Sequence, residues 1–346
     1  MASGSGRPVR RPHPRDITAQ TRTPAGPGAA VTADRTFGPR RETITSEVIE
    51  PRPRRVQKGS MHTSHRIDLP QGPVHYREHG ARGPAVVVVH GLLVEHRVFG
   101  DVPERLAAKG YRCLVPDWPL GAHPEGMSPD ADLTPHGVAK LISDFIEKLG
   151  LTDVTLVGND SGGALCQMVA TRHPERIGRL ALTTCDAFEC FPPPAFKYLL
   201  LAARVPGVMA VLSASMRAVR VLQRLPIAYG KLTKKRLDQS LLDAWVAPSA
   251  KAEIRRDVGK FMRAIDARDL IDAAEALGHF QRPVLIAWTP EDTFFPVSLA
   301  HRLKEKVPHA RLELIEDALV FVSLDQPERV ASLLADFCAT AKVHAA

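Results

Sequence analysis

One stretch decides the fold of this chain: Val154-Thr-Leu-Val-Gly158-Asn159-Asp160-Ser161-Gly162-Gly163-Ala-Leu. An apolar run leads directly into a helix-forming run through a turn that has small residues at both ends. Such a strand-to-helix turn is sharp and strained, and it exposes one side chain above the sheet. Gly158 and Gly162 lack the Cβ atoms that would clash there, so we expect the exposed residue to be Asp160. A frame one residue later would expose Ser161, but Asn159 fits the crowded position less well than Gly158 does.

The segments on both sides of this turn alternate between strand and helix patterns. Residues 85–89 are an unbroken run of alanine and valine, typical of a parallel strand that is covered on both faces. Thr134 is a suitable N-cap for the helical pattern that follows it. We expect strands at 65–69, 74–79, 85–89, 111–115, 154–158 and 180–184, and helices at 102–109, 133–149 and 161–172. This alternation predicts an α/β fold with a mostly parallel, doubly wound sheet.

The alternation is interrupted after Asp186. Residues 187–276 are helix-like throughout and rich in Ala, Leu, Arg and Lys. Strand and helix patterns then resume, with strands at 284–288 and 310–315 and helices at 297–306 and 326–341. The sequence therefore predicts one sheet domain in two parts, 61–186 and 277–346, with a helical insertion between them.

The first 60 residues differ from the rest in composition and charge. They are rich in Arg, Pro, Gly, Ser and Thr, show no hydrophobic period, and are predicted to be a disordered basic tail. They contain 12 Lys/Arg and 5 Asp/Glu, and so carry most of the net charge of +8. The remainder is close to neutral, which removes the main support for a nucleic-acid interface. This segment has two interpretations. Either translation begins at Met61, or the segment is a basic tail that interacts with a partner.

Composition also restricts the compartment and the partners. The five cysteines form no CxxC pair and no Cys/His metal spacing, so we expect neither a disulfide framework nor a bound metal or other cofactor. No run reaches the roughly 18 apolar residues that a membrane span needs. No apolar segment near the N-terminus is typical of a secretory signal. These features predict a cytoplasmic protein that acts on a small molecule, with no membrane or nucleic-acid partner.

The turn at Asp160, together with further motifs, resembles the α/β-hydrolase superfamily over residues 62–342. His90-Gly91, after the valine run, is similar to the family's oxyanion loop. The resemblance implies an oxyanion hole made of the backbone N–H groups of Leu92 and Ser161.

Two more features extend this resemblance towards the C-terminus. The segment 288–296, Trp-Thr-Pro-Glu-Asp-Thr-Phe-Phe-Pro, resembles the loop that carries the catalytic acid, which implies that role for Asp292. The helical insertion 187–276 lies where members of the family carry a cap. Asp186 occupies the position of the acid in some members, although a strand-end cap is the simpler interpretation.

An aspartate at the turn resembles the branch that contains haloalkane dehalogenases and epoxide hydrolases. A carboxylate attacks an sp³ carbon well and forms an alkyl ester, which a second step can hydrolyse. The resemblance is incomplete, because dehalogenases place halide-binding side chains where this chain has Ser161 and Leu92. Epoxide hydrolases use cap tyrosines as acids, and Tyr198 and Tyr229 lie in the insertion, where simple packing is the alternative.

The family's catalytic histidine is missing from its usual place. The segment before Gln326-Pro327-Glu328 has Val320 at the matching position, and valine can neither accept a proton nor activate water. His96 and His123 are the candidates to replace it, because they lie in loops at the correct end of the sheet, whereas His279 lies at the wrong end. For each of these histidines, a structural role is the simpler interpretation.

These observations leave three functions open. We expect first a hydrolase of a small, fairly hydrophobic molecule that uses Asp160 as nucleophile. The second is a lyase-type or isomerase-type enzyme in which Asp160 and Asp292 share an apolar site, which raises the pKa of one of them. The third is a catalytically silent ligand-binding homologue. The basic residues of the insertion also allow an anionic group on the ligand.

Overall fold

The computed structural model describes residues 62–339, so the expectation of a disordered tail over 1–60 lies outside the described residues. These residues build an eight-stranded sheet in the order β1-β2-β4-β3-β5-β6-β7-β8. The strand β2 is antiparallel to both of its neighbours, β1 and β4, and every other neighbouring pair is parallel. The strands are β1 (His62–Leu69), β2 (Gly72–His79), β3 (Ala85–Val89), β4 (Arg112–Asp117), β5 (Val154–Asp160), β6 (Ile177–Cys185), β7 (Val284–Trp288) and β8 (Arg311–Leu314). The predicted α/β fold with a mostly parallel sheet is confirmed.

The central strands are apolar because both of their faces are covered. Every residue of β3, β6 and β7 is buried, whereas the edge strand β8 has no buried residue. Burial of the β-branched run in β3 removes its side chains from water on both sides of the sheet, which stabilises the fold. The sheet's core therefore lies around β3, β5 and β6.

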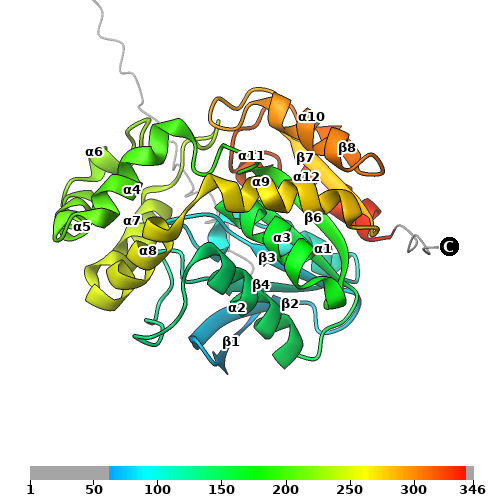
Figure 1. Cartoon of the computed structure of the whole chain (residues 1–346), viewed down its shortest axis with the longest axis horizontal. Helices are drawn as coiled ribbons and strands as arrows, with labels where there is room; N and C mark the ends of the chain where they lie inside the picture. Colours follow the sequence, from blue (N-terminus) through cyan, green and yellow to red (C-terminus); the bar gives the residue numbers. More distant parts are fainter. Residues whose placement is uncertain (1–61, 340–346) are drawn as a thin grey trace, which may run out of the picture. The chain divides into compact units, whose positions relative to one another are not determined.

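Helices join the parallel strands as the alternation predicts (Figure 1). The helix α1 packs against α12, while α2 and α9 both pack against α3. Thr134 is the N-cap of α2, where its hydroxyl accepts the Gly137 N–H at 3.1 Å. These helices are α1 (Val102–Ala108), α2 (Pro135–Lys148), α3 (Ser161–Arg172), α9 (Ala267–Ala276), α10 (Val297–Lys306), α11 (Val322–Asp325) and α12 (Pro327–Cys338).

The segment between β6 and β7 is helical. Its last helix, α9, lies beside α3 in the layer that covers the sheet, and the preceding helices extend to one side (Figure 1). We call these preceding helices the cap: α4 (Lys197–Arg204), α5 (Val208–Ala218), α6 (Arg220–Gln223), α7 (Gln239–Val246) and α8 (Ala252–Ala264). Among residues 62–339, no helix has the length and apolar character to cross a membrane.

Specific contacts fasten the cap to the sheet domain. The Trp245 ring meets Phe321 edge-on at 5.6 Å between centroids. The Phe321 N–H donates to the Leu232 carbonyl at 2.9 Å. The buried Asp325 carboxylate accepts the Lys234 and Lys235 N–H groups at 2.9 and 3.1 Å. The cap therefore has a defined position over the carboxyl ends of the parallel strands.

Candidate functional site

The strand β5 ends at Asp160, and α3 begins at the next residue. Asp160 has φ 54° and ψ −134°, a conformation that residues other than glycine rarely adopt. The turn fits only because its neighbours are glycines. A Cβ on Gly162 would lie 2.0 Å from the Val89 carbonyl oxygen, and one on Gly91 would lie 1.9 Å from Asp160 Oδ2. The strained backbone therefore holds the Asp160 carboxylate against the loop after β3.

The backbone N–H groups of Ser161 and Leu92 face the Asp160 carboxylate and favour its ionised form. These are the two donors that the sequence predicts for an oxyanion hole. Burial raises the pKa of Asp160 to about 7, with a smaller contribution from the charge of Asp292, and the two N–H donors oppose that rise. Near neutral pH, this carboxyl is therefore divided between its acid and its ionised form.

Asp292 lies in the loop after β7, as the sequence predicts, and is 5% exposed. Its Oδ1 accepts the N–H groups of Phe294 and Phe295 at 2.8 and 2.7 Å, whereas its Oδ2 has no hydrogen-bond partner in the described chain. Burial raises its pKa to about 6. One oxygen is thus fixed by the backbone, and the other remains available to a proton or a water molecule.

Asp186 is a third carboxyl group near the turn. It directly follows β6, is fully buried, and its N–H donates to the Asp160 carbonyl at 3.3 Å. No hydrogen bond of ordinary geometry reaches either carboxylate oxygen, although the Ser161 side chain offsets part of the pKa shift. Burial, and then the charge of Asp160, raise the pKa of Asp186 well above its ordinary value. The neutral acid is therefore the favoured form of Asp186.

Val320 is fully buried in the loop before α11, and no imidazole takes its place among the described residues that line the cavity. Its carbonyl accepts the Asn159 amide at 2.8 Å. The same amide donates to the Thr183 and Thr184 carbonyls at 3.0 and 3.2 Å. Asn159 therefore ties the turn to β6 and to the Val320 loop, a role that sequence reasoning missed because the partners are distant in the chain.

Of the four other histidines considered from the sequence, three are held by hydrogen bonds or ion pairs. His90 accepts the Trp118 N–H at Nε2, and its Nδ1 lies 2.9 Å from the Gly91 carbonyl, which fixes the loop beside Asp160. His96 lies between the carboxylates of Glu95 and Asp117. His123 accepts the Gly121 N–H at 3.4 Å and lies 3.3 Å from Asp257. His279 is exposed in a turn before β7.

A cavity lies between the cap and Asp160, with about 990 Å³ of empty space including its opening. Its wall is mostly apolar, with contributions from the loop after β3, from the Pro192–Pro193 segment and from α4, α5 and α7. The polar side chains among the lining residues are Asp160, Ser161, Tyr198, Ser213, Tyr229, Trp245 and Ser249. An apolar cavity with few polar groups suits a small hydrophobic ligand.

Both predicted cap tyrosines line this cavity, but their hydroxyl protons are engaged. Tyr198 donates to the Ile227 carbonyl at 2.7 Å, and Tyr229 donates to the Leu93 carbonyl at 2.8 Å. Burial raises the pKa of both phenols. Either tyrosine could protonate a substrate oxygen only by giving up its bond to the backbone.

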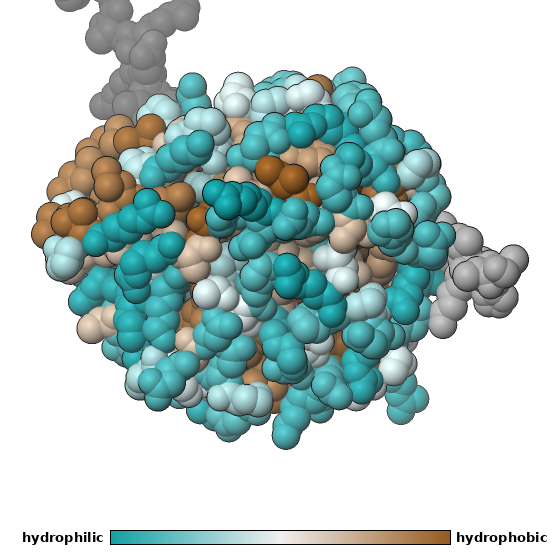
Figure 2. Space-filling view, viewed as in Figure 1, coloured by the Kyte–Doolittle hydropathy of each residue, from teal (hydrophilic) through white to brown (hydrophobic). Residues whose placement is uncertain are grey.

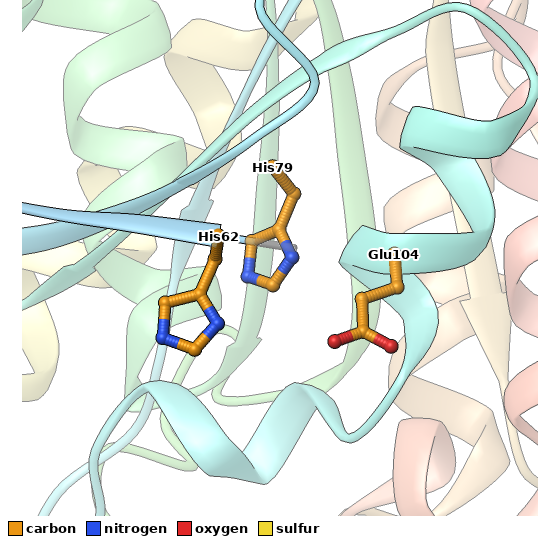
Figure 3. A group of neighbouring side chains, drawn as sticks. All are labelled: His62, His79 and Glu104. Carbon is orange, nitrogen blue, oxygen red and sulfur yellow. The ribbon is translucent and has the colours of Figure 1, made fainter. Parts of the chain in front are cut away.

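Two groups of possible metal ligands occur in the described part of the chain. One consists of Glu95, His96 and Asp117, where Arg97 and Arg77 already neutralise the carboxylates. The other consists of His62, His79 and Glu104 (Figure 3). His79 pairs with Cys113 at the start of β4, so this group lies at the opposite end of the sheet from Asp160. Sequence spacing does not reveal it, since β1, β2 and α1 each supply one ligand.

Comparisons with known proteins agree with this fold. A family model described as "alpha/beta hydrolase fold" matches residues 84–327. Haloalkane dehalogenase 2 of Mycobacterium tuberculosis is 27% identical over 278 residues, which cover 78% of this chain and 92% of the relative. The crystal structure of a haloalkane dehalogenase of Bradyrhizobium elkani has 20% identity and a TM-score of 0.67, and covers 80% of this chain and 98% of its own. A solved epoxide hydrolase has 17% identity and a TM-score of 0.68, with coverage of 80% and 99%.

Proposed function

We propose a nucleophilic mechanism for this chain, which belongs to the α/β-hydrolase fold family and is a hydrolase of that fold. Asp160 is the nucleophile, and the substrate is a small hydrophobic molecule with an electrophilic sp³ carbon. The observation that carries the proposal is the strained Asp160, whose carboxylate lines an apolar cavity beside two backbone N–H groups that favour its ionised form. A binding protein gains nothing from a strained and buried carboxylate at this position.

The first step forms an alkyl ester. An oxygen of ionised Asp160 attacks the carbon, a C–O bond forms, and the bond to the leaving group breaks with its electron pair. In the second step, water attacks the ester carbonyl of Asp160, and the N–H groups of Leu92 and Ser161 stabilise the oxyanion. Its collapse breaks the bond between the carbonyl carbon and the alkyl oxygen, and the alkyl group leaves as an alcohol that takes up the proton lost by the water. The proton of that water has no histidine to receive it, because Val320 is in that position. Asp292, with one unpartnered oxygen, is the base that remains, so the second step is slow.

An epoxide suits this site better than an alkyl halide. Two relatives by sequence or structure are named as haloalkane dehalogenases, and one structural neighbour is named as an epoxide hydrolase. A departing halide needs hydrogen-bond donors, but Leu92 and Ser161 place no indole or amide side chain in the cavity. The indole N–H of Trp245, in the cavity wall, already donates to Glu95 at 3.0 Å. An opening epoxide keeps its oxygen, which Tyr198 or Tyr229 could protonate from the cavity wall by giving up its bond to a backbone carbonyl.

A second candidate is acid–base chemistry without a covalent step. It is favoured by the raised pKa values of Asp160, Asp186 and Asp292, which give the site both an acid and a base near neutral pH. In this case Asp160, which lines the cavity, would exchange protons with the substrate, Asp292 would act through its charge on Asp160, and no ester would form. An adduct on Asp160 separates the two candidates directly.

The test is intact mass spectrometry after incubation with a panel of epoxides, alkyl halides and activated esters. We expect an adduct that peptide mapping places on Asp160 and that Asp160→Asn abolishes. The matched control is Ser161→Ala, which keeps the backbone N–H and removes only the neighbouring hydroxyl, so its adduct should persist. An adduct lost in Ser161→Ala but kept in Asp160→Asn would contradict the proposal. Turnover without an adduct, lost in Asp292→Asn, would favour the acid–base candidate.

A further inference from the structure

Exposed apolar side chains are concentrated on one part of the cap. Of the ten exposed large apolar residues within 62–339, nine lie between 198 and 227, and Leu314 is the other. Val211, Val221 and Leu201 are 67%, 65% and 62% exposed. Figure 2 shows the hydrophobic surface gathered at the left of the view, over the region of α4, α5 and α6. We call these nine residues the apolar cap face: Tyr198, Leu201, Val205, Val208, Val211, Val219, Val221, Leu225 and Ile227.

The same segment has an unbalanced charge. Residues 190–237 contain nine Lys/Arg and no Asp/Glu. Lys197, Arg204, Arg220 and Lys231 are exposed, so positive charge accompanies the apolar surface. Arg220 is paired with Asp243 at 2.8 Å, whereas no ion pair involving Lys197 or Arg204 occurs in the described chain. Exposed apolar side chains accompanied by bases are typical of a protein surface that lies on an anionic lipid layer.

The apolar cap face is continuous with the cavity. Tyr198 and Ile227 belong to the face and also line the cavity, and the Tyr198 hydroxyl bonds to the Ile227 carbonyl at 2.7 Å. On the inner side of the same helices, Leu199, Met209 and Leu212 line the cavity wall. Thus α4 and α5 separate the cavity above Asp160 from the exposed apolar surface.

We propose that the apolar cap face docks on an anionic lipid surface and that hydrophobic substrate passes from the lipid between α4 and α5 into the cavity. The delivery of substrate rests on the proposed function, whereas docking does not. Other occupants are disfavoured by charge: a second copy would bring the same bases, and residues 1–60 are also strongly basic. The sequence predicts no membrane partner because no segment spans a bilayer, but a face that lies on the surface needs no such segment.

The test is flotation of the full-length chain with vesicles of phosphatidylcholine alone or mixed with phosphatidylserine. We expect binding to the mixed vesicles, weaker binding at high salt, and at least a tenfold loss of binding in Val211→Glu/Val221→Glu. The matched control is Leu314→Glu, which changes an exposed apolar residue outside the face and should bind as the parent does. All variants keep the basic residues 1–60, so their charge cannot explain a difference.

Two results would overturn this proposal. One is a parent protein that does not float with mixed vesicles. This result would overturn the proposal whether the apolar cap face is then covered by a second copy of the chain or by an acidic protein. The other is a Val211→Glu/Val221→Glu variant that floats as well as Leu314→Glu does. Asp160→Asn should float like the parent, so a failure of the chemistry and a failure of docking are distinguishable. The substituted side chains are exposed, and a thermal unfolding curve confirms that the variants fold.

A second inference rests on a separate observation at the other end of the sheet. His62 and His79 are directly opposed in the β1–β2 register, and their rings are 5.3 Å apart. Glu104 reaches the same place from α1, and a ligand atom of each residue lies within 4.8 Å of the others. Figure 3 shows the three side chains converging, with His79 between the other two. His79 is 8% exposed, and its Nδ1 has no hydrogen-bond partner in the described chain.

We propose that His62, His79 and Glu104 bind a zinc ion. Two imidazole nitrogens and one carboxylate oxygen are a donor set that zinc prefers, with ligand distances of about 2.0–2.2 Å. A small inward movement of the exposed Glu104 closes the set. The ion would join the edge strand β1 and its neighbour β2 to α1.

Isothermal titration of the chelator-treated, tag-free chain with zinc chloride tests this site, with magnesium chloride as a hard-cation control. We expect one zinc site and an increase of several degrees in the unfolding temperature. Glu104→Gln and His62→Gln should each weaken zinc binding at least tenfold. His65→Gln, on an exposed histidine of the same strand, should not. The absence of a zinc site, or equal binding by Glu104→Gln, His62→Gln and His65→Gln, would overturn the proposal.

Discussion

At the scale of the residue, the state of one proton decides whether Asp160 can react. Only the ionised carboxylate is a nucleophile, and burial raises its pKa to about 7. At pH 6 only about a tenth of the carboxyl groups are ionised, and at pH 8 about nine-tenths are. The desolvated carboxylate is more reactive than an exposed one but is scarcer at low pH.

We therefore expect the rate of ester formation on Asp160 to increase about tenfold between pH 6 and pH 8. Stopped samples analysed by intact mass provide the rate. The same pKa shift affects the free energy of unfolding, because the folded state holds this proton more tightly than the unfolded state does. The contribution of Asp160 to that free energy therefore decreases as pH rises from the ordinary pKa of an aspartate to about 7. Asp160→Asn should remove that part of the decrease. A rate that is flat across pH 6–8 would mean that Asp160 ionises outside this window.

The second prediction concerns Val320, which takes the place of a base. The backbone N–H of Val320 acts on the Asp292 carboxylate, so in Val320→His the new imidazole would belong to a residue beside this acid and could activate water. We expect the ester on Asp160 to clear at least tenfold faster than in the parent. Because Val320 is fully buried, a polar ring there should lower the free energy of unfolding by about 1–3 kcal/mol.

Pulse labelling and chase by mass spectrometry measure the clearance of the Val320→His ester. A matched variant, Val320→Leu, tests the effect of volume without a base, and it should clear no faster than the parent. Labelling of Val320→His at the parental rate establishes that its site is folded. If a labelled Val320→His cleared as slowly as Val320→Leu, the assignment of this position to the missing base would be wrong.

At the scale of the element, Asn159 connects three segments that are far apart in sequence. Its amide donates to β6 and to the loop before α11. We expect Asn159→Leu, which keeps the volume but removes the donor, to lower the free energy of unfolding by about 1–3 kcal/mol, because buried carbonyls lose a partner. Chemical denaturation measures this. Gln281→Leu, which removes an exposed amide, should change it by less than about 0.5 kcal/mol, and equal effects would contradict the role of Asn159.

Strand order explains why so much of the site is predictable from sequence. Parallel strands end at the same edge of a sheet, so carboxyl groups that follow β5, β6 and β7 must lie near one another. This places Asp160, Asp186 and Asp292 from local patterns alone. Glycines at the sharp turn and Thr134 at the start of α2 are equally local signals, and the structure contains both features.

Contacts between distant segments could not be predicted in this way. The Asn159 bond to Val320, the tyrosine bonds to backbone carbonyls, and the meeting of His62, His79 and Glu104 depend on tertiary packing. Neither hydrophobic periodicity nor the spacing of motifs predicts these contacts. The nucleophile, the base and the substrate remain predictions, because they concern reactivity rather than position.

At the scale of the whole molecule, the cap has an inner surface that faces the cavity and an outer surface that faces solvent. Its inner surface shapes the cavity, and its outer surface is the apolar cap face. If both proposals hold, a substrate dissolved in lipid reaches Asp160 faster than the same substrate dispersed in water. A small, water-soluble epoxide has no such advantage, since it enters from solution in either case.

We therefore expect vesicles that contain phosphatidylserine to accelerate ester formation on Asp160 severalfold with a long-chain epoxide, and to leave the rate with a short, soluble epoxide unchanged. The acceleration should disappear in Val211→Glu/Val221→Glu and persist in Leu314→Glu, while both variants react with the soluble epoxide at the parental rate. Intact mass measured over time gives all of these rates. Equal acceleration of both epoxides would point to an effect of lipid on the enzyme's conformation, and it would remove the path from lipid to cavity from the mechanism.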